Sequence, residues 1–389
     1  MTIRTLRTLS PELVRVFAAA AMMALLVPLP RPAAAFETAA PQAILIDDAT
    51  GTVLFEKNVD ITVPPASMSK LMTIYLTFEL LAEERLAPDD TFPVSEKAWR
   101  MGGSKMFVEV GSRVTIEDLL RGVIIQSGND ACIVLAEGIA GSEEAFAEQM
   151  NRKAAELGLM DSYFLNATGW PDEGHVMSVR DIAQISHHLI HDFPDHYPLF
   201  AELEFTYSGI RQGNRNPLLY KGLGADGLKT GYTEASGYGL AASVVQNDRR
   251  MILVIHGLES VNQRSQEAER LLNYGMHEFG NYSLFEKDEV VLDAEVWLGQ
   301  EALVPLVLDE ALTVTLKRRS RSDLQVAVVY DGPIPAPIEA GEEVAQLVVS
   351  APDVPTLELP LRAQRSIERL SGFGRIGAAI NYLLWGPGG

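Results

Sequence analysis

The segment around Pro64-Pro65 constrains the fold most, because the two prolines are followed at once by a long apolar segment with helical periodicity. Ser67 is therefore expected at the start of a buried helix, with Lys70 one turn later on the same face. A serine hydroxyl needs a neighbouring base to act as a nucleophile. A lysine can be that base only if burial or a nearby cation lowers its pKa. The Ser67-x-x-Lys70 pattern thus predicts a nucleophile and its base, although so short a pattern also recurs by chance.

The first 35 residues have the pattern of an export signal. Three arginines precede an apolar run over residues 16–29, and Ala33-Ala34-Ala35 offers a cleavage site, so that the mature chain begins at Phe36. The alternative is an uncleaved anchor, but the run is too short to span a membrane comfortably. Cys132 is the single cysteine, which excludes an internal disulfide.

The length of 389 residues allows two domains, and the formal charge of −20 argues against nucleic acid as a partner. Helical and strand patterns alternate until about residue 282, beginning with a hairpin over residues 43–56. Short β-branched runs broken by Gly and Pro then follow, which predict a small all-β domain. We therefore expect an α+β fold with a signal peptide, a first domain, an all-β domain and a C-terminal helix, over residues 1–35, 36–282, 283–360 and 361–389.

Two further polar motifs interrupt apolar segments. Ser127-Gly128-Asn129 lies between two predicted helices, where a side chain can point into a cleft or simply cap the next helix. Lys229-Thr230-Gly231 is predicted on an edge strand of an antiparallel sheet, and its glycine would allow close approach of a ligand.

A metal site is conceivable at His187 and His191, which share one face of a predicted helix. No HExxH pattern is present, and histidines near a helix end are often solvated or paired with the helix dipole. We therefore expect neither a metal nor a cofactor.

The last segment combines positive charge with an apolar stripe. The segment contains four arginines and only one acidic residue; the arginines are Arg362, Arg365, Arg369 and Arg375. From Phe373 onward, its apolar side chains fall on an arc about 100° wide at helical spacing. A helix lying on a membrane surface fits this pattern. The alternative is a helix docked on its own domain, and Gly374 and Gly377 weaken helix formation in either case.

The three motifs, in this order, resemble those of penicillin-binding serine peptidases, and specifically of low-molecular-mass D-alanyl-D-alanine carboxypeptidases. The resemblance extends to longer blocks and covers about residues 43–275; the blocks lie at 125–132, 209–216 and 226–233. It implies a β-lactamase/DD-peptidase-like domain, in which an antiparallel sheet is flanked by helices. The family's layout also includes a small β domain and an amphipathic tail.

The resemblance implies a role for each motif residue. Ser67 would attack the carbonyl between two terminal D-alanines, Lys70 would take its proton, and Ser127 would relay a proton to the leaving D-alanine. Asn129 would hold the peptide backbone or Lys70. Lys229, Thr230, Gly231 and Tyr232 would bind substrate, with the terminal carboxylate on Lys229 and Thr230 and an oxyanion hole made by the N–H groups of Ser67 and Tyr232.

The same resemblance implies partners and a location. The substrate would be the pentapeptide stem of peptidoglycan, and β-lactams would acylate the same serine. The chain would be periplasmic and peripherally attached to the inner membrane through its tail.

Two alternatives and one departure stay open. A class A-like β-lactamase needs Glu-x-x-Leu-Asn between the second and third motifs, but Leu165-Asn166 is preceded at that spacing by Ser162. An inactive wall-binding scaffold is the other alternative. Some family members have an arginine directly after the glycine that corresponds to Gly257, but here Leu258 follows it. Arg211 or Arg264 could take a share of carboxylate recognition instead.

Overall fold

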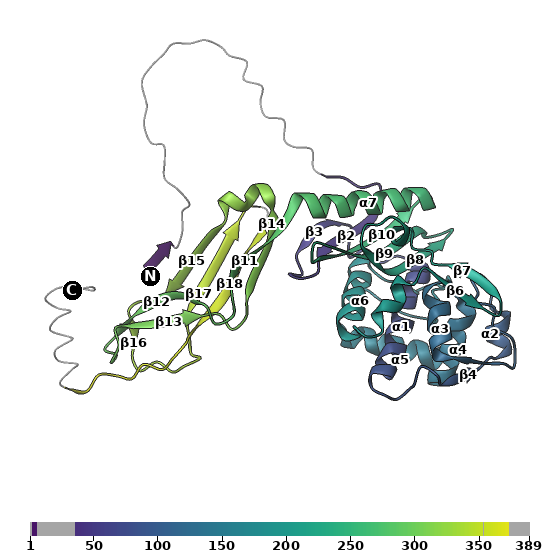
Figure 1. Cartoon of the computed structure of the whole chain (residues 1–389), viewed down its shortest axis with the longest axis horizontal. Helices are drawn as coiled ribbons and strands as arrows, with labels where there is room; N and C mark the ends of the chain where they lie inside the picture. Colours follow the sequence, from purple (N-terminus) through teal and green to yellow (C-terminus); the bar gives the residue numbers. More distant parts are fainter. Residues whose placement is uncertain (1, 6–35, 353, 373–389) are drawn as a thin grey trace, which may run out of the picture. The chain divides into compact units, whose positions relative to one another are not determined.

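The computed structural model describes residues 2–5, 36–352 and 354–372. The chain divides into two compact units between His277 and Glu278, slightly before the predicted boundary at residue 282 (Figure 1). The predicted signal peptide lies outside the described residues, except for β1 (Thr2–Thr5), which pairs with a strand of the second unit.

A five-stranded antiparallel sheet forms the centre of the first unit, in the order β3-β2-β10-β9-β8. The strands are β2 (Gln42–Asp47), β3 (Val53–Lys57), β8 (Ala225–Thr233), β9 (Gly237–Gln246) and β10 (Arg249–Leu258). The predicted hairpin is confirmed as β2 and β3, which are joined by a turn that contains Gly51. The long apolar runs of β9 and β10 are buried because both strands are central in the sheet.

Helices cover both faces of this sheet (Figure 1). On one face lie α1 (Lys70–Ala82), α2 (Glu96–Arg100), α3 (Ile116–Ile124), α4 (Asn129–Ala140), α5 (Glu143–Glu156) and α6 (Val179–Asp192); α7 (Val261–Glu278) lies on the other. Helix α1 is central, because ten of its residues are buried and seven of these belong to the main hydrophobic core. The side chains of Thr115 and Ser178 cap α3 and α6, as their capping-box spacing predicts.

Short elements complete the first unit. They are the 3₁₀ helices η1 (Ala66–Ser69), η2 (Tyr197–Ala201) and η3 (Pro217–Tyr220), and the strand pairs β4 (Thr91–Pro93) with β5 (Arg113–Thr115) and β6 (Glu204–Tyr207) with β7 (Ile210–Gly213). Because η1 leads directly into α1, Ser67 lies at the start of a buried helix, as predicted.

The second unit is all β apart from one 3₁₀ helix, η4 (Arg318–Asp323), among its described residues. Its strands are β11 (Phe279–Phe285), β12 (Val290–Trp297), β13 (Leu303–Val307), β14 (Leu312–Lys317), β15 (Gln325–Tyr330), β16 (Ile334–Pro335), β17 (Glu343–Ala351) and β18 (Val354–Ala363). Strands β11 and β14 form a pair, and the others belong to a larger sheet with their own core.

The β unit continues past the predicted boundary at residue 360. Strand β18 ends at Ala363, Ile367 bridges to Ile338, and Arg369 bridges to Gly299. Ile367 is almost fully buried, which explains why this stretch joins the β core. The apolar stripe of the predicted helix begins at Phe373, outside the described residues. Within the described part of the chain, no helix is long and apolar enough to cross a membrane.

Candidate active site

The hydroxyl of Ser67 and the amine of Lys70 are hydrogen-bonded, with 2.8 Å between Lys70 Nζ and Ser67 Oγ. Ser67 is partly exposed, whereas Lys70 is completely buried. Lys70 Nζ also donates to the carbonyl oxygen of Thr168, at 2.5 Å. These two hydrogen bonds hold the Lys70 amine beside the Ser67 hydroxyl, which is the geometry that a general base needs.

The pKa of Lys70 is lowered to about 8, chiefly by burial and to a smaller extent by the positive charge of Arg215, while Cys132 and Asp130 oppose the shift. The prediction that desolvation tunes this lysine therefore agrees with the structure. A lysine with a pKa near 8 is partly neutral at physiological pH, so it can accept a proton from Ser67.

The second and third motifs also meet directly. Lys229 Nζ donates to Ser127 Oγ at 2.8 Å and to the carbonyl of Thr230 at 3.2 Å. Ser127 has a φ of +59°, an uncommon value for a residue other than glycine, so the backbone turns sharply just before α4. Lys229 and Thr230 are on β8, which is an edge strand, as predicted.

The pKa of Lys229 is also lowered, first by burial and then by the charges of Lys70 and Arg215. Repulsion by the charge of Lys70 is thus one cause of the lowered pKa of Lys229. A negatively charged ligand beside Lys229 would reverse this effect and hold the amine protonated. Lys229, Lys70 and Arg215, here called the cationic cluster, therefore favour the binding of an anion.

Gly231 packs closely against η1. A Cβ atom there would lie 3.0 Å from the carbonyl oxygen of Pro65 and 3.3 Å from Cβ of Ala66. The glycine thus lets β8 pack against η1 itself, and this contact brings the third motif beside Ser67. The next residue, Tyr232, is half exposed and stacks on Tyr238 with 4.2 Å between ring centroids.

Asn129 holds a loop and does not contact Lys70 among its recorded hydrogen bonds. Its side-chain amide donates to the carbonyl of Gly102 at 2.9 Å, and its backbone N–H donates to Ser104. The loop that contains Gly102 and Ser104 is thus tied to the start of α4. A Cβ atom at position 128 would lie 2.9 Å from Asp130 Oδ1, so a residue larger than glycine is disfavoured there. The Ser-Asp-Asn sequence of class A β-lactamases, which places an aspartate at this position, is therefore disfavoured in this chain.

Two positions near the site were missed by the sequence reasoning. Asn166 Oδ1 accepts hydrogen bonds from the backbone N–H groups of Thr168, Gly169 and Trp170, and so fixes the loop whose carbonyl receives Lys70. Arg215 hydrogen-bonds Ser104 Oγ at 2.5 Å and acts electrostatically on both lysines. In the sequence, only the polar block at residues 209–216 indicated that Arg215 contributes to the site.

The structure separates the two arginines that were considered for carboxylate binding. Arg211 is exposed and paired with Glu204 on the β6–β7 hairpin. Arg264, on α7, is 5% exposed, its Nε atom has no hydrogen-bond partner, and its guanidinium lies 5.9 Å from the Tyr238 ring. Its charge acts on Lys229, so Arg264 is the arginine of the two that belongs to the cationic cluster.

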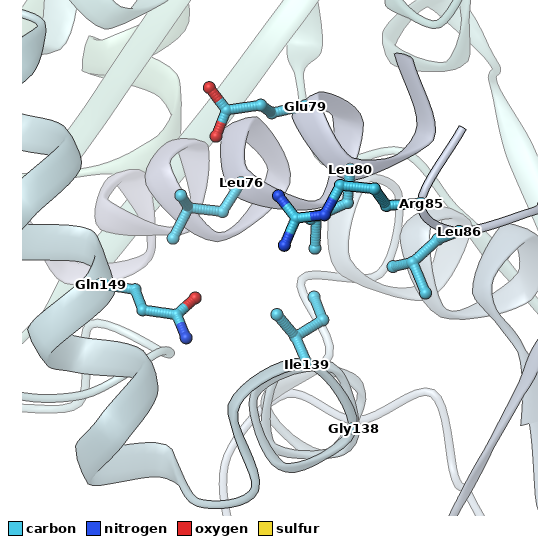
Figure 2. Close-up of a pocket in the computed structure, with 8 residues that line it drawn as sticks. All are labelled: Leu76, Glu79, Leu80, Arg85, Leu86, Gly138, Ile139 and Gln149. Atoms are coloured by element: carbon cyan, nitrogen blue, oxygen red, sulfur yellow. The ribbon is translucent and has the colours of Figure 1, made fainter. Parts of the chain in front are cut away.

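A separate pocket of about 290 Å³ lies at the other end of the same helices (Figure 2). It is lined by Leu76, Glu79, Leu80, Arg85, Leu86, Gly138, Ile139 and Gln149. These residues belong to the later parts of α1 and α4, the segment after α1, and α5, whereas the motif residues lie where α1 and α4 begin. The pocket is therefore not part of the candidate active site.

Comparison with known proteins agrees with this geometry. Residues 30–260 match the family described as D-alanyl-D-alanine carboxypeptidase, and residues 279–369 match the C-terminal domain of penicillin-binding protein 5. The chain is 37% identical over 341 residues to D-alanyl-D-alanine carboxypeptidase DacC of Escherichia coli K12, covering 86% of this chain and 85% of that protein.

Solved structures show the same relationship. Penicillin-binding protein 5 from Haemophilus influenzae is similar with a TM-score of 0.78 and 30% identity, over 87% of this chain and all of that one. Penicillin-binding protein D2 from Listeria monocytogenes in its ampicillin-bound form has a TM-score of 0.57 and 26% identity, over 63% of this chain and all of that one. The chain therefore belongs to the D-alanyl-D-alanine carboxypeptidase family of low-molecular-mass penicillin-binding proteins, and it is a serine-type D-Ala-D-Ala carboxypeptidase.

Proposed function

We propose that Ser67 is the nucleophile that cleaves the terminal D-Ala-D-Ala bond of the peptidoglycan stem, through an acyl-enzyme on its Oγ. The observation that carries this proposal is the 2.8 Å hydrogen bond from the buried amine of Lys70 to the partly exposed hydroxyl of Ser67. Neutral Lys70 takes the hydroxyl proton as Oγ attacks the carbonyl carbon. The N–H groups of Ser67 and Tyr232 stabilise the oxyanion, and Ser67 fits this role because the first N–H groups of a helix have no intrahelical acceptor.

Collapse of the tetrahedral intermediate breaks the C–N bond. Ser127, hydrogen-bonded to Lys229, relays to the leaving amine of D-alanine the proton that Lys70 took from Ser67, so Lys70 is again neutral and Ser127 keeps its hydroxyl. Water then adds to the ester, and the carboxylic acid and free Ser67 are released. No step needs a metal or a cofactor. The same attack on a β-lactam carbonyl gives a penicilloyl ester, in keeping with the ampicillin bound to the similar Listeria protein.

One assay tests the assignment against its alternatives. Purified protein is incubated with a peptide ending in D-Ala-D-Ala and with a fluorescent penicillin, followed by mass spectrometry of the adduct. D-alanine release with a long-lived adduct on Ser67 is the expected result. Rapid turnover of penicillin without D-alanine release would favour a β-lactamase. Absence of both reactions would indicate an inactive scaffold.

Carboxylate recognition by the cationic cluster gives a testable prediction for Arg264. With Arg264→Ala, kcat/KM for the D-Ala-D-Ala peptide should fall about 10- to 100-fold, because a hydrogen bond to a charged group contributes about 1.5–3 kcal/mol. Arg211→Ala is the matched control and should change kcat/KM less than about twofold, since its partner is Glu204 on the surface. Equal losses in the two variants would contradict the assignment.

We also propose that the chain is periplasmic and is attached to the membrane surface by its C-terminal segment. The apolar stripe that begins at Phe373 and the nearby arginines support this proposal. Deleting residues 373–389 should move the mature protein from the membrane fraction to the soluble fraction while D-alanine release persists. A deletion from Arg362 is unsuitable, because Ile367 belongs to the β core. If the deleted protein stays membrane-bound after signal cleavage, the tail is not the anchor.

A further inference from the structure

Three metal-ligating side chains from two distant segments meet beside the turn between β2 and β3. His187 Nδ1 lies 2.8 Å from Asp48 Oδ1, and His191 Nε2 lies 2.9 Å from Asp48 Oδ2. One ligand atom from each of the three residues lies within 4.8 Å of the other two. We propose that Asp48, His187 and His191 form a binding site for a divalent transition metal ion, with Zn²⁺ as the best-matched ion.

The chemistry of the donors favours this class of ion. Two imidazoles and a carboxylate are common zinc ligands, and histidines four residues apart on a helix present their rings on one face. Zinc–ligand bonds of about 2.1 Å place tetrahedral ligand atoms roughly 3.4 Å apart. The two contacts with Asp48, at 2.8 and 2.9 Å, are somewhat shorter than that value, and the three ligand atoms lie within 4.8 Å of one another, so modest rotation of the two rings would complete the site. Three protein ligands leave one tetrahedral position for water.

The three ligands differ in how freely they can move, because one is buried and the other two are about half exposed. The Asp48 carboxylate is 5% exposed, and its backbone N–H is held by the carbonyl of Arg250, whereas the two histidine side chains are about half exposed. A metal ion can therefore enter from solvent without opening the core. The imidazoles can turn toward it because they are at the surface, while the carboxylate stays in place.

The surrounding charges leave the Asp48 carboxylate available. Arg250 lies 3.9 Å from the Asp48 carboxylate, but its guanidinium makes a closer ion pair with Asp226, at 2.7 Å. The neighbouring Asp47 is instead occupied by Arg249. His188, between the two ligand histidines in the sequence, interacts with Asp192 and does not belong to the cluster.

The consequence would be structural and not catalytic. The bound ion would join the β2–β3 turn to α6 across 139 residues of chain, and thereby stabilise the packing of the helix on the sheet. None of the three ligands takes part in the Ser67 chemistry. Zinc should therefore raise thermal stability with little change in the rate of D-alanine release.

The test uses the mature protein without a polyhistidine tag, stripped with EDTA and titrated with zinc chloride. Calorimetry should give one site, and zinc at a hundredfold excess over Kd should raise Tm by about 5–10 °C. His187→Asn and His191→Asn should each weaken zinc binding at least tenfold. His188→Asn is the matched control and should bind zinc as the parent does.

The contrary results are equally clear. Absence of zinc binding in the parent protein, or unchanged affinity in both ligand variants, would overturn the site. Equal weakening by His188→Asn would also overturn it, because binding would then be a general property of surface histidines. Unfolding temperatures in EDTA establish that each variant folds, and since both ligand histidines are half exposed, these substitutions test the site without opening the core.

Discussion

Ser67→Ala should abolish D-alanine release and prevent any covalent penicillin adduct. The variant retains Lys70, Lys229 and the helix start but has no oxygen to form the acyl-enzyme. Loss of a serine nucleophile in a comparable catalytic cluster costs on the order of 10⁶-fold in kcat, so we expect at least a 10³-fold loss here. D-alanine release from a D-Ala-D-Ala peptide and fluorescent-penicillin labelling measure the two effects.

Ser69→Ala is the matched control, because Ser69 lies in the same 3₁₀ helix and its buried hydroxyl has no hydrogen-bond partner. This variant should be labelled by penicillin and release D-alanine at nearly the parent rate. Both variants should unfold at temperatures close to the parent's. Labelling of the Ser67→Ala protein at another residue, with D-alanine release preserved, would refute the assignment of the nucleophile.

Much of the fold could be predicted because the relevant signals are local. The apolar run after Pro65 determines α1, and the turn chemistry around Gly51 determines the β2–β3 hairpin. The boundaries between units were less accurate. Residues such as Ile367 join the β core through a single isolated bridge, and an isolated bridge has no periodic pattern in the sequence.

The candidate site, too, was only partly predictable from the sequence. Its side-chain motifs were visible, but the partners that position them are backbone groups. The carbonyl of Thr168 receives Lys70, and the carbonyl of Gly102 receives Asn129. Any residue type has such a carbonyl, so composition and spacing give no indication of which one faces the site.

The convergence on Asp48 was hidden for a different reason. His187 and His191 were recognisable as a pair, but Asp48 lies on a hairpin turn that precedes them by more than a hundred residues. A turn aspartate is usually explained by local turn chemistry. Only the packing of α6 on β2 and β10 brings the third ligand to the two histidines.

Acylation by penicillin should speed up with rising pH and level off above the pKa of Lys70, about 8. Protonated Lys70 cannot take the Ser67 proton, and the neutral fraction of a base grows about tenfold per pH unit below its pKa and saturates above it. Single-turnover acylation at saturating penicillin measures this profile. Lys70→Met should slow acylation by about 10²- to 10⁴-fold and remove the rise, since a general base contributes that much.

The pH at the midpoint of the acylation profile distinguishes a general-base role of Lys70 from a merely structural one. Arg215 is one of the charges that lower the pKa of Lys70, so Arg215→Ala should move the midpoint to higher pH. The shift should be smaller than the total displacement from 10.5, because burial is the larger cause and remains in the variant. Lys221→Met, at a surface ion pair with Glu269, should leave the midpoint unchanged. A profile that stays flat between pH 6 and 9 in the parent protein would show that another group accepts the proton.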